Sequence, residues 1–234
     1  MVGIIVAVSE ELDAIKLHLK NSSVEEAFGT KFYVGEMKSK NGEGVKCVVV
    51  LCGVGKVNAA RTAQLLIDKY NPEYVINVGV AGGISDKVKI GDIVIGDKLV
   101  QYDFDLTAFG RELGELSGGL GKYICSDKAL VIKAHNILVN DDQVKGVLGI
   151  IASGDRFVTD TKVSKEVNKI FEADCVEMEG AAIAQVCHID NVPFVVIRSI
   201  SDSPNDNNKV DYDTFVSSAS KTVADFVHKF VLVK

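Results

Sequence analysis

The sequence has no tryptophan, only three prolines and no stretch dense in lysine or arginine. Its 234 residues carry 26 basic and 32 acidic side chains, which gives a net charge of −6. An acidic chain without a basic patch binds a phosphate backbone or an anionic membrane surface poorly. We therefore expect neither a nucleic acid nor a membrane among its partners.

The sequence also lacks the patterns of a membrane span and of a signal peptide. No apolar run reaches the roughly 18 residues that a membrane span needs. The short apolar run at the N-terminus follows no basic residue and leads directly into acids, which is not typical of a signal peptide. The five cysteines are odd in number and form no C-x-x-C pair, which indicates reduced thiols. Together these features predict a cytoplasmic protein.

Several motifs of cofactor and nucleophile chemistry are absent as well. The four histidines form neither H-x-x-x-H nor H-E-x-x-H, so we expect no metal site. The segment 53–58 lacks the third glycine of a dinucleotide fingerprint, and the glycine-rich run 117–123 departs from a P-loop. No G-x-S-x-G elbow presents a serine nucleophile. These absences exclude nucleoside triphosphate chemistry and serine hydrolase chemistry, and we expect no cofactor.

Segments with strand and helix patterns alternate along the chain, which is typical of an α/β fold. Apolar, β-branched runs predict strands at 2–8, 31–38, 45–51, 74–80, 92–101, 147–152 and 192–200. Helical spacing of apolar residues predicts helices at 9–20, 58–70, 127–139, 162–171, about 179–188 and from about 211 to the C-terminus. Ser9 is the expected N-cap of the first helix. We expect one domain over residues 1–234, with three α/β/α layers and a central mixed, twisted sheet.

Acidic residues recur where the predicted strands end. They stand at four such ends: Glu10 and Glu11, then Asp155, then Glu177 and Glu179, and finally Asp202. Ligands in α/β folds bind beyond the carboxyl ends of the strands, so we expect these acids to converge on one crevice. Because like charges raise one another's pKa, such a cluster is costly unless it serves a reaction.

Carboxylates without a metal, a histidine base or a nucleophile suit the cleavage of a glycosidic bond. One carboxyl group activates a water molecule and another protonates the leaving group. If the leaving group is a purine, its proton donor must keep a raised pKa. Asp202 fits this role because it follows the apolar segment 195–197, where burial disfavours the anion. Phe157 is a candidate for stacking on a flat base, although core packing explains a phenylalanine equally well.

Eight short segments, spread over nearly the whole chain, carry a more specific signal. They are AVSEE (7–11), GVGKV (53–57), NVGVAGG (77–83), VKIGD (88–92), DLTAFG (105–110), SGDRFV (153–158), VEMEGAA (176–182) and RSISD (198–202). Together they resemble the 5′-methylthioadenosine/S-adenosylhomocysteine nucleosidases of the nucleoside phosphorylase superfamily. The resemblance implies a nucleoside phosphorylase-like domain that hydrolyses the adenine–ribose bond of both thio-nucleosides in methionine salvage, with no cofactor and no metal.

The resemblance implies a role for three of the acids. Glu11 would activate the hydrolytic water, Glu179 would bind the ribose hydroxyls, and Asp202 would protonate N7 of adenine. Arg198 would lie close to Glu11 as a further catalytic residue. Glu177 and the Met178 backbone would bind the ribose hydroxyls alongside Glu179, and Ser201 would help to orient Asp202.

The resemblance also implies the walls of the substrate site. Phe157 would stack on adenine, and the Val158 backbone would read the edge of the base. The other substrate-binding residues that it implies are Val8, Ala81, Gly82, Tyr212 and Phe215. Phe109 lies in the glycine-rich segment 103–122, which we expect to form a long loop. It would reach into the site of a neighbouring subunit, which implies a homodimer.

Two positions depart from the family pattern. Val80 stands where many relatives carry serine, which removes a hydroxyl group near the water or the ribose. Ser117 stands where many relatives carry proline, which loosens the loop over the 5′ substituent. The preference among 5′ substituents therefore stays open, whereas the three central acids are intact.

Three alternatives are kept beside this interpretation. A purine nucleoside phosphorylase would need a phosphate pocket, normally lined with arginines, and arginine is scarce in this chain. A nucleosidase for aminodeoxyfutalosine would use the same chemistry on another substrate. A nucleoside-binding or surface-adhesion module without catalysis would not need the intact acids. Phosphate dependence of turnover separates the first alternative from the main interpretation.

Overall fold

The computed structural model describes residues 1–39, 41–203 and 208–233, apart from the side chains of residues 208–211. A ten-stranded sheet runs through the described residues. The strands are β1 (Val2–Val6), β2 (Leu19–Ala27), β3 (Thr30–Lys38), β4 (Gly44–Leu51), β5 (Tyr74–Gly83), β6 (Ile93–Gln101), β7 (Ile124–Cys125), β8 (Gly146–Ser153), β9 (Cys175–Glu177) and β10 (Phe194–Asp202). The helices are α1 (Ser9–Lys16), α2 (Lys56–Tyr70), α3 (Lys128–Val139), α4 (Thr161–Phe171), α5 (Gly180–Ile189), α6 (Asn208–Leu232) and the short 3₁₀ helix η1 (Thr107–Phe109).

The sheet is mixed, as the sequence predicts. β5 lies parallel to both β1 and β10. β10 also pairs antiparallel with β6, and β6 leads through β8 and β9 back to β5, so these five strands close into a ring. β4, β3 and β2 extend the sheet beyond β1. The ring brings the ends of β5, β9 and β10 next to one another.

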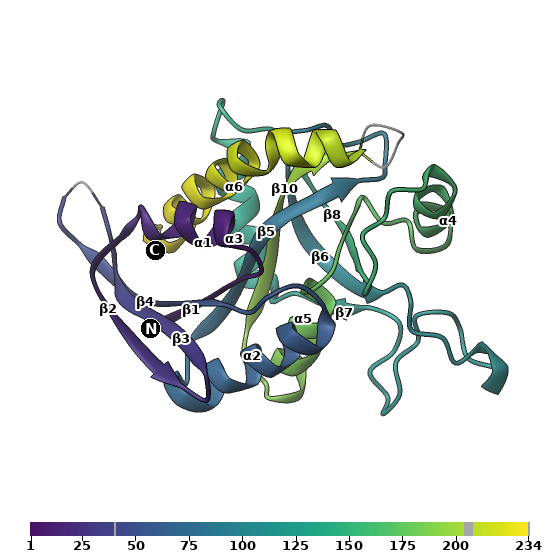
Figure 1. Ribbon diagram of the computed structural model, residues 1–234, viewed down its shortest axis with the longest axis horizontal. Coiled ribbons are helices and arrows are strands. Elements are labelled where there is room, and N and C mark those ends of the chain that lie inside the picture. Colours follow the sequence, from purple (N-terminus) through teal and green to yellow (C-terminus); the bar gives the residue numbers. More distant parts are fainter. Residues whose placement is uncertain (40, 204–207, 234) are drawn as a thin grey trace.

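Helices cover both faces of the sheet, which confirms the predicted layers. α1, α3 and α6 lie on one face, and α2 and α5 lie on the other (Figure 1). The side chains that face these two layers form two separate buried clusters, and a third, smaller cluster lies beside α4. Because both faces of the central strands are covered, β1 is buried at each of its positions, and its sequence is a continuous apolar run.

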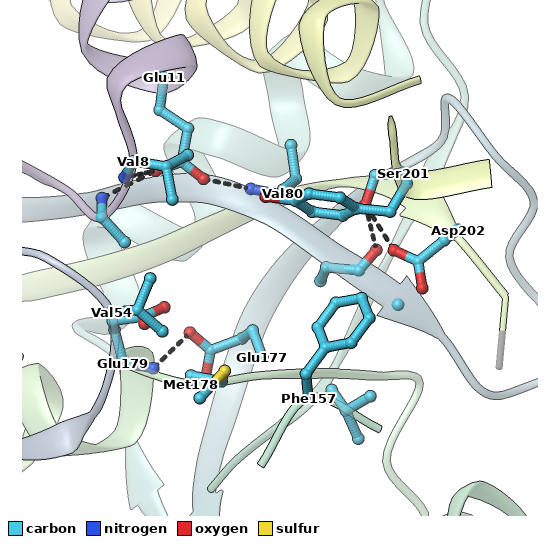
Figure 2. Close-up of a pocket in the computed structure, with 15 residues that line it drawn as sticks. Val8, Glu11, Val54, Val80, Phe157, Glu177, Met178, Glu179, Ser201 and Asp202 are labelled. Carbon is cyan, nitrogen blue, oxygen red and sulfur yellow. Dashed lines mark hydrogen bonds between the residues drawn. The ribbon is translucent and has the colours of Figure 1, made fainter. Parts of the chain in front are cut away.

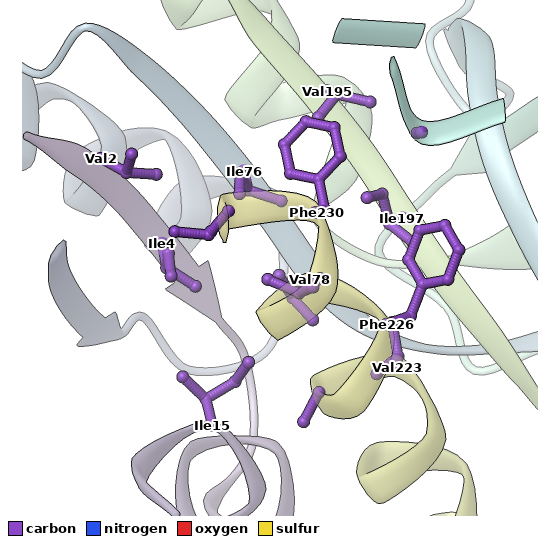
Figure 3. Packing of buried hydrophobic residues seen from close by; sticks show 14 of the residues in the cluster. Val2, Ile4, Ile15, Ile76, Val78, Val195, Ile197, Val223, Phe226 and Phe230 are labelled. Atoms are coloured by element: carbon purple, nitrogen blue, oxygen red, sulfur yellow. The ribbon is translucent and has the colours of Figure 1, made fainter. Parts of the chain in front are cut away.

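The long helix α6 shows how side-chain spacing directs the packing. Val223, Phe226 and Phe230 recur at helical spacing and so share one face of α6. Both phenylalanines are fully buried and lie against Val195 and Ile197 of β10 (Figure 3). This packing holds α6 along the sheet and places its N-terminal part near the end of β5 (Figure 1).

The predicted elements are confirmed to within a few residues except near the N-terminus and at the final helix. The first strand ends at Val6, and the first helix ends at Lys16 rather than near residue 20. The next segment, 19–27, forms β2, which the sequence does not predict because this edge strand is mostly polar and exposed. The last helix already begins at Asn208.

The expected cap of the first helix is also wrong. Val8, not Ser9, occupies the N-cap position of α1, with φ −126° and ψ 161°. The Val8 N–H is bound instead by the Glu11 carboxylate at 3.1 Å. The acid at the start of α1 therefore takes over part of the capping.

Two further features concern membrane-spanning helices and the cysteines. None of the helices in the described part of the chain combines the length and the apolar character needed to cross a bilayer. All five cysteines are free thiols.

Candidate functional site

Of the acids singled out in the sequence, four line one cavity where β1, β5 and β10 end, whereas Glu10 and Asp155 do not line it. The described residues that line it are Ala7, Val8, Glu11, Val54, Val80, Ala81, Gly82, Phe157, Val176, Glu177, Met178, Glu179, Ser201, Asp202 and Tyr212. Figure 2 shows Glu11, Glu179, Asp202 and Phe157 around this cavity. These four acids converge as expected, although β9, which leads to Glu177, runs antiparallel to β5.

Glu11 is 3% exposed near the start of α1. Its carboxylate accepts hydrogen bonds from the backbone N–H groups of Ala7 at 2.7 Å, Val8 at 3.1 Å and Val80 at 2.9 Å. Burial raises the pKa of Glu11, and the Arg198 charge and these three N–H groups oppose the rise. A carboxylate with a raised pKa is a better base for water than an exposed one. The backbone contact at Val80 persists although the side chain carries no hydroxyl.

Arg198 lies behind the acids and is the largest of the fully buried side chains among the described residues. It forms a close ion pair with Glu177. Its Nη2 also donates to Asn77 Oδ1 at 2.5 Å and lies 3.9 Å from a carboxylate oxygen of Glu179. Asn77 Nδ2 donates to the Ile5 carbonyl at 3.0 Å, which fixes the orientation of the amide. One positive charge is thus held where it offsets the burial of several negative ones.

Glu177 is surrounded by donors, although it lines the cavity. Besides its ion pair with Arg198, its carboxylate accepts hydrogen bonds from the Ser153 hydroxyl and from the N–H groups of Glu179 at 3.1 Å and Gly180 at 2.7 Å. These contacts tie Glu177 to the guanidinium and to the start of α5. We therefore assign it to the support of Arg198 and α5 rather than to direct ribose binding.

Glu179 faces the cavity from the position before α5. One of its carboxylate oxygens accepts a hydrogen bond from the Gly55 N–H at 2.9 Å, and the side chain does not cap α5. Burial, assisted by the charge of Glu177, raises the pKa of Glu179 to about 7 against the opposing effect of Arg198. At neutral pH a substantial fraction of this group is ionised, and a carboxylate accepts hydrogen bonds from hydroxyl groups.

A bulge at the end of β10 turns Asp202 into the cavity. The pairing of β10 with β5 shifts between Ile200 and Asp202, so Ser201 is the extra residue. The Ser201 hydroxyl donates to Asp202 Oδ1 at 2.6 Å, and Asp202 is 2% exposed. Burial disfavours the ionised form of a carboxyl group, which suits a proton donor. The raised pKa that we expect for Asp202 stays a prediction.

Two aromatic side chains from distant segments form a wall of the cavity. The rings of Phe157 and Tyr212 have centroids 5.4 Å apart and planes inclined at 78°. Phe157 is 44% exposed, which leaves ring surface for a flat base. Burial raises the pKa of Tyr212 to about 12, so its hydroxyl stays protonated. A smaller cavity beside Phe157 is lined by Arg156 and Val158 as well.

Four of the predicted residues do not line the cavity: Arg198 and Val158, described above, and Phe215 and Phe109. Phe215 is 36% exposed on α6 and is not among the described residues that line it. Phe109 is 82% exposed in η1, on the teal loop that projects from the body in Figure 1. Its predicted place in a second subunit's site stays a prediction.

The structure adds residues that the sequence did not single out. Ala7, Val54 and Val176 line the cavity, and Asn77 and Ser153 hold its charged groups. All five lie in or next to the eight segments of the family resemblance, so those segments are the signal that could have found them. Their partners lie far along the chain, and a sequence pattern does not show such contacts.

The carboxylates of the site accept hydrogen bonds from Arg198, from the hydroxyls of Ser153 and Ser201, and from backbone N–H groups. Within the described ranges, no group of three His, Cys, Asp or Glu side chains could hold a metal ion. The carboxyl groups and Arg198 of this site can transfer protons and stabilise charge.

The chain matches the family described as "Phosphorylase superfamily" over residues 1–232. The 5′-methylthioadenosine/S-adenosylhomocysteine nucleosidase of Shewanella loihica is 40% identical over 220 residues, which are 93% of each chain. The protein of the same name from Geobacillus thermodenitrificans is 37% identical over 232 residues, which are 99% of this chain and 96% of the relative.

Solved structures are similar over almost the same range. A nucleosidase of Neisseria meningitidis, solved with methylthio-immucillin-A, has a TM-score of 0.92 at 35% identity and covers 98% of this chain and 97% of its own. A futalosine hydrolase of Helicobacter pylori has a TM-score of 0.90 at 31% identity and covers 98% of this chain and 96% of its own. The chain therefore belongs to the phosphorylase superfamily and, within it, to the family of the 5′-methylthioadenosine/S-adenosylhomocysteine nucleosidases.

Proposed function

We propose that the protein hydrolyses the N-glycosidic bond of 5′-methylthioadenosine and of S-adenosylhomocysteine and releases adenine and the thio-ribose product. The negative charge of the cavity is the main support for this proposal. Among the described residues that line it, four are acids and none is a lysine or an arginine. Such a cavity stabilises an oxocarbenium-like transition state, which is cationic, and repels an anionic nucleophile. The relatives of the same family support the choice of substrate.

The departure of adenine depends on Asp202 in this proposal. A base stacked on Phe157 would present N7 to the Asp202 carboxyl group, which Ser201 orients through its 2.6 Å hydrogen bond. As the bond between sugar and base lengthens, its electron pair moves to the ring and N7 takes the proton. The base then leaves as neutral adenine.

Water attack depends on Glu11. The Glu11 carboxylate, fixed by three backbone N–H groups, takes a proton from the water that attacks the anomeric carbon. Glu179 binds the ribose hydroxyls and adds negative charge beside the developing cation. Arg198 limits the mutual repulsion of the acids, so that several of them are ionised together.

The phosphorylase alternative is less well supported. A phosphate anion in place of the water would lie close to Glu11 and Glu179, and none of the described residues that line the cavity is a lysine or an arginine. The guanidinium of Arg198 is already paired with Glu177, and Arg156 lines the smaller cavity near Phe157 rather than this one. Burying a second anion there would cost more than burying a neutral water.

One observation favours a second substrate. The futalosine hydrolase of Helicobacter pylori shares the fold at 31% identity. We therefore keep aminodeoxyfutalosine hydrolysis as a candidate side activity of the same acids.

The assembly and the cellular setting are proposed as well. We propose a cytoplasmic homodimer that removes thio-nucleoside by-products of S-adenosylmethionine reactions and feeds methionine salvage. The 82% exposure of Phe109 supports the dimer, because a large aromatic side chain at a loop tip is stabilised when a second surface covers it.

A substrate panel with matched variants tests the function. Release of the free base (hypoxanthine from inosine, adenine from the others) is measured for methylthioadenosine, S-adenosylhomocysteine, aminodeoxyfutalosine and inosine, with the wild type and with Glu11→Gln, Glu179→Gln and Asp202→Asn. We expect release from both thio-nucleosides and losses of at least about 100-fold in kcat for Glu11→Gln and Asp202→Asn. Glu26→Gln, on the exposed edge strand β2, is the control and should match the wild type. Full activity of Asp202→Asn would exclude Asp202 as the proton donor.

A further inference from the structure

Lys56 connects three segments that border the cavity but is not one of its lining residues. Its backbone N–H donates to Asp155 Oδ1 at 2.8 Å. Its Nζ donates to Asp103 Oδ1 at 2.5 Å and to Gln101 Oε1 at 3.1 Å. The first residue of α2 is thereby tied both to the loop that follows β8 and to the start of the long loop that follows β6.

Asp103 connects Lys56 to Asp155. Its second oxygen, Oδ2, accepts a hydrogen bond from the Asp155 N–H at 2.8 Å, so the Asp103 carboxylate bridges Lys56 Nζ and the Asp155 backbone. The Lys56 and Asp103 side chains are 16% and 31% exposed, and a partly buried pair of this kind is screened less than a surface pair. We call Lys56, Asp103 and Asp155 the clasp.

The clasp adjoins the groups that hold Glu179. Gly55, next to Lys56, donates the N–H that binds Glu179 at 2.9 Å. Gly55 has φ 101°, a conformation that favours glycine, and a Cβ at this position would lie 3.1 Å from Asp155 Oδ1. The position of this N–H is therefore fixed by the clasp that surrounds it.

A second route leads from the clasp to the same acid. Gln101, which accepts from Lys56, donates through Nε2 to Gln185 Oε1 at 2.6 Å. Gln185 belongs to α5, the helix that Glu179 precedes. The clasp thus contacts both the donor that holds the Glu179 carboxylate and the helix that carries its backbone.

We infer that Lys56, Asp103 and Asp155 are positioning residues that hold Glu179 for ribose binding and connect it to the loop that carries Phe109. This inference rests on the proposed function, because that function assigns Glu179 to the ribose hydroxyls. The Lys56 ammonium group acts through Asp103 and Gln101 and does not contact the substrate. Opening the clasp releases Gly55 and lets the Glu179 carboxylate move away from the sugar.

The test compares three substrates in three variants, Lys56→Met, Lys69→Met and Asp103→Asn. Lys56→Met removes the charge and keeps the length of the side chain, and Lys69→Met is the matched control. Lys69 lies at the other end of α2 and pairs with Glu25 at 2.9 Å. The wild type and the three variants are assayed for adenine release from 5′-methylthioadenosine and from its 2′-deoxy and 3′-deoxy analogues.

We expect Lys56→Met to raise KM for methylthioadenosine about tenfold, the effect of weakening a hydrogen bond to a charged group. For the analogue that lacks the hydroxyl bound by Glu179, the rise should stay below about twofold, because that contact is already missing. Lys69→Met should change neither value. Asp103→Asn, which keeps an acceptor for the Asp155 N–H, should give a smaller rise with the same dependence on the hydroxyl.

The outcomes separate the two proposals. An equal rise in KM for all three substrates, or no rise in either clasp variant, overturns the clasp and leaves the hydrolase intact. If Lys56→Met does not fold, as judged by circular dichroism and gel filtration, Asp103→Asn decides by the same comparison. A wild type that releases no adenine from methylthioadenosine overturns the proposed function and the clasp together.

Discussion

The Glu179 carboxyl group is subject to opposing influences, of which burial is the strongest. Burial and the charges of Glu177 and Glu11 favour its neutral form, whereas Arg198 and the Gly55 N–H favour the ionised form. The result is a pKa of about 7. If the ionised form binds the ribose hydroxyls, substrate binding should weaken as the pH falls below this value.

Replacing Glu179 by glutamine should make the stability less dependent on pH. The folded state raises the pKa of Glu179 from 4.5 to about 7, so it binds the proton more tightly than the unfolded state does. The stabilisation from this proton is fully present below pH 4.5 and is lost as the pH rises through about 7. The Tm of Glu179→Gln should therefore rise by several degrees relative to the wild type between pH 4.5 and pH 8, since about 1 kcal/mol moves Tm by about 2–4 °C at this chain length.

Thermal unfolding monitored by circular dichroism at several pH values measures this difference. The exposed acid variant Glu26→Gln is the control, and its Tm should follow the wild type throughout. A constant Tm difference between Glu179→Gln and the wild type over this range would contradict the raised pKa.

At the scale of elements, strand β5 must pass closely under two charged side chains. A Cβ at Gly79 would lie 2.5 Å from Arg198 Nη1 and 2.6 Å from Glu11 Oε1. Neither charged group can move without breaking the hydrogen bonds that hold it. The glycine therefore gives Arg198 and Glu11 the space in which they approach each other.

Gly79→Ala should accordingly impair catalysis more than folding. We expect adenine release to fall about 100-fold, because both groups must shift, and stability to fall by about 1–3 kcal/mol. Gly83→Ala, on the same strand, is the matched control, since its Cβ would meet methyl groups of Ile200 and Val88 at 3.1 Å. Assays of release and of Tm for both variants check this, and equal losses of activity would contradict it.

The elements differ in how well the sequence predicts them, for physical reasons. β1, β5 and β10 are predicted because both of their faces are buried, which leaves an apolar run. β2 is missed because an exposed edge strand needs no apolar face, and helix 9–20 is predicted too long because Leu19 continues an apolar pattern that in fact begins this strand. Glu11 and Asp202 are predictable because they follow predicted strands, whereas Glu177 and Glu179 belong to or follow β9, a three-residue strand too short to show a pattern.

The contacts that organise these acids belong to the scale of the whole molecule. Asn77 and Arg198 lie 121 residues apart in the sequence, and Gly55 and Glu179 lie 124 apart. The closure of five strands into a ring brings such partners together, and no local pattern encodes that closure. The projecting loop with Phe109 adds one more long-range contact if a second subunit covers it.

Phe109→Ala tests that contact. In the proposed homodimer Phe109 covers the 5′ substituent in the partner's site, so its loss should raise KM for methylthioadenosine about tenfold. The Tm should change little, because Phe109 is 82% exposed in the single chain. Phe28→Ala, at another exposed phenylalanine, is the control and should leave KM unchanged. Elution as a monomer in gel filtration, or an unchanged KM for Phe109→Ala, would argue against a shared site.

The identity of the nucleophile is the central claim, and isotope labelling measures it directly. Methylthioadenosine is turned over in ¹⁸O-water, with and without inorganic phosphate, and the sugar product is examined by mass spectrometry. The acidic cavity predicts one ¹⁸O atom on the anomeric carbon and the same rate in both buffers. Turnover that requires phosphate and yields the sugar 1-phosphate would contradict the account.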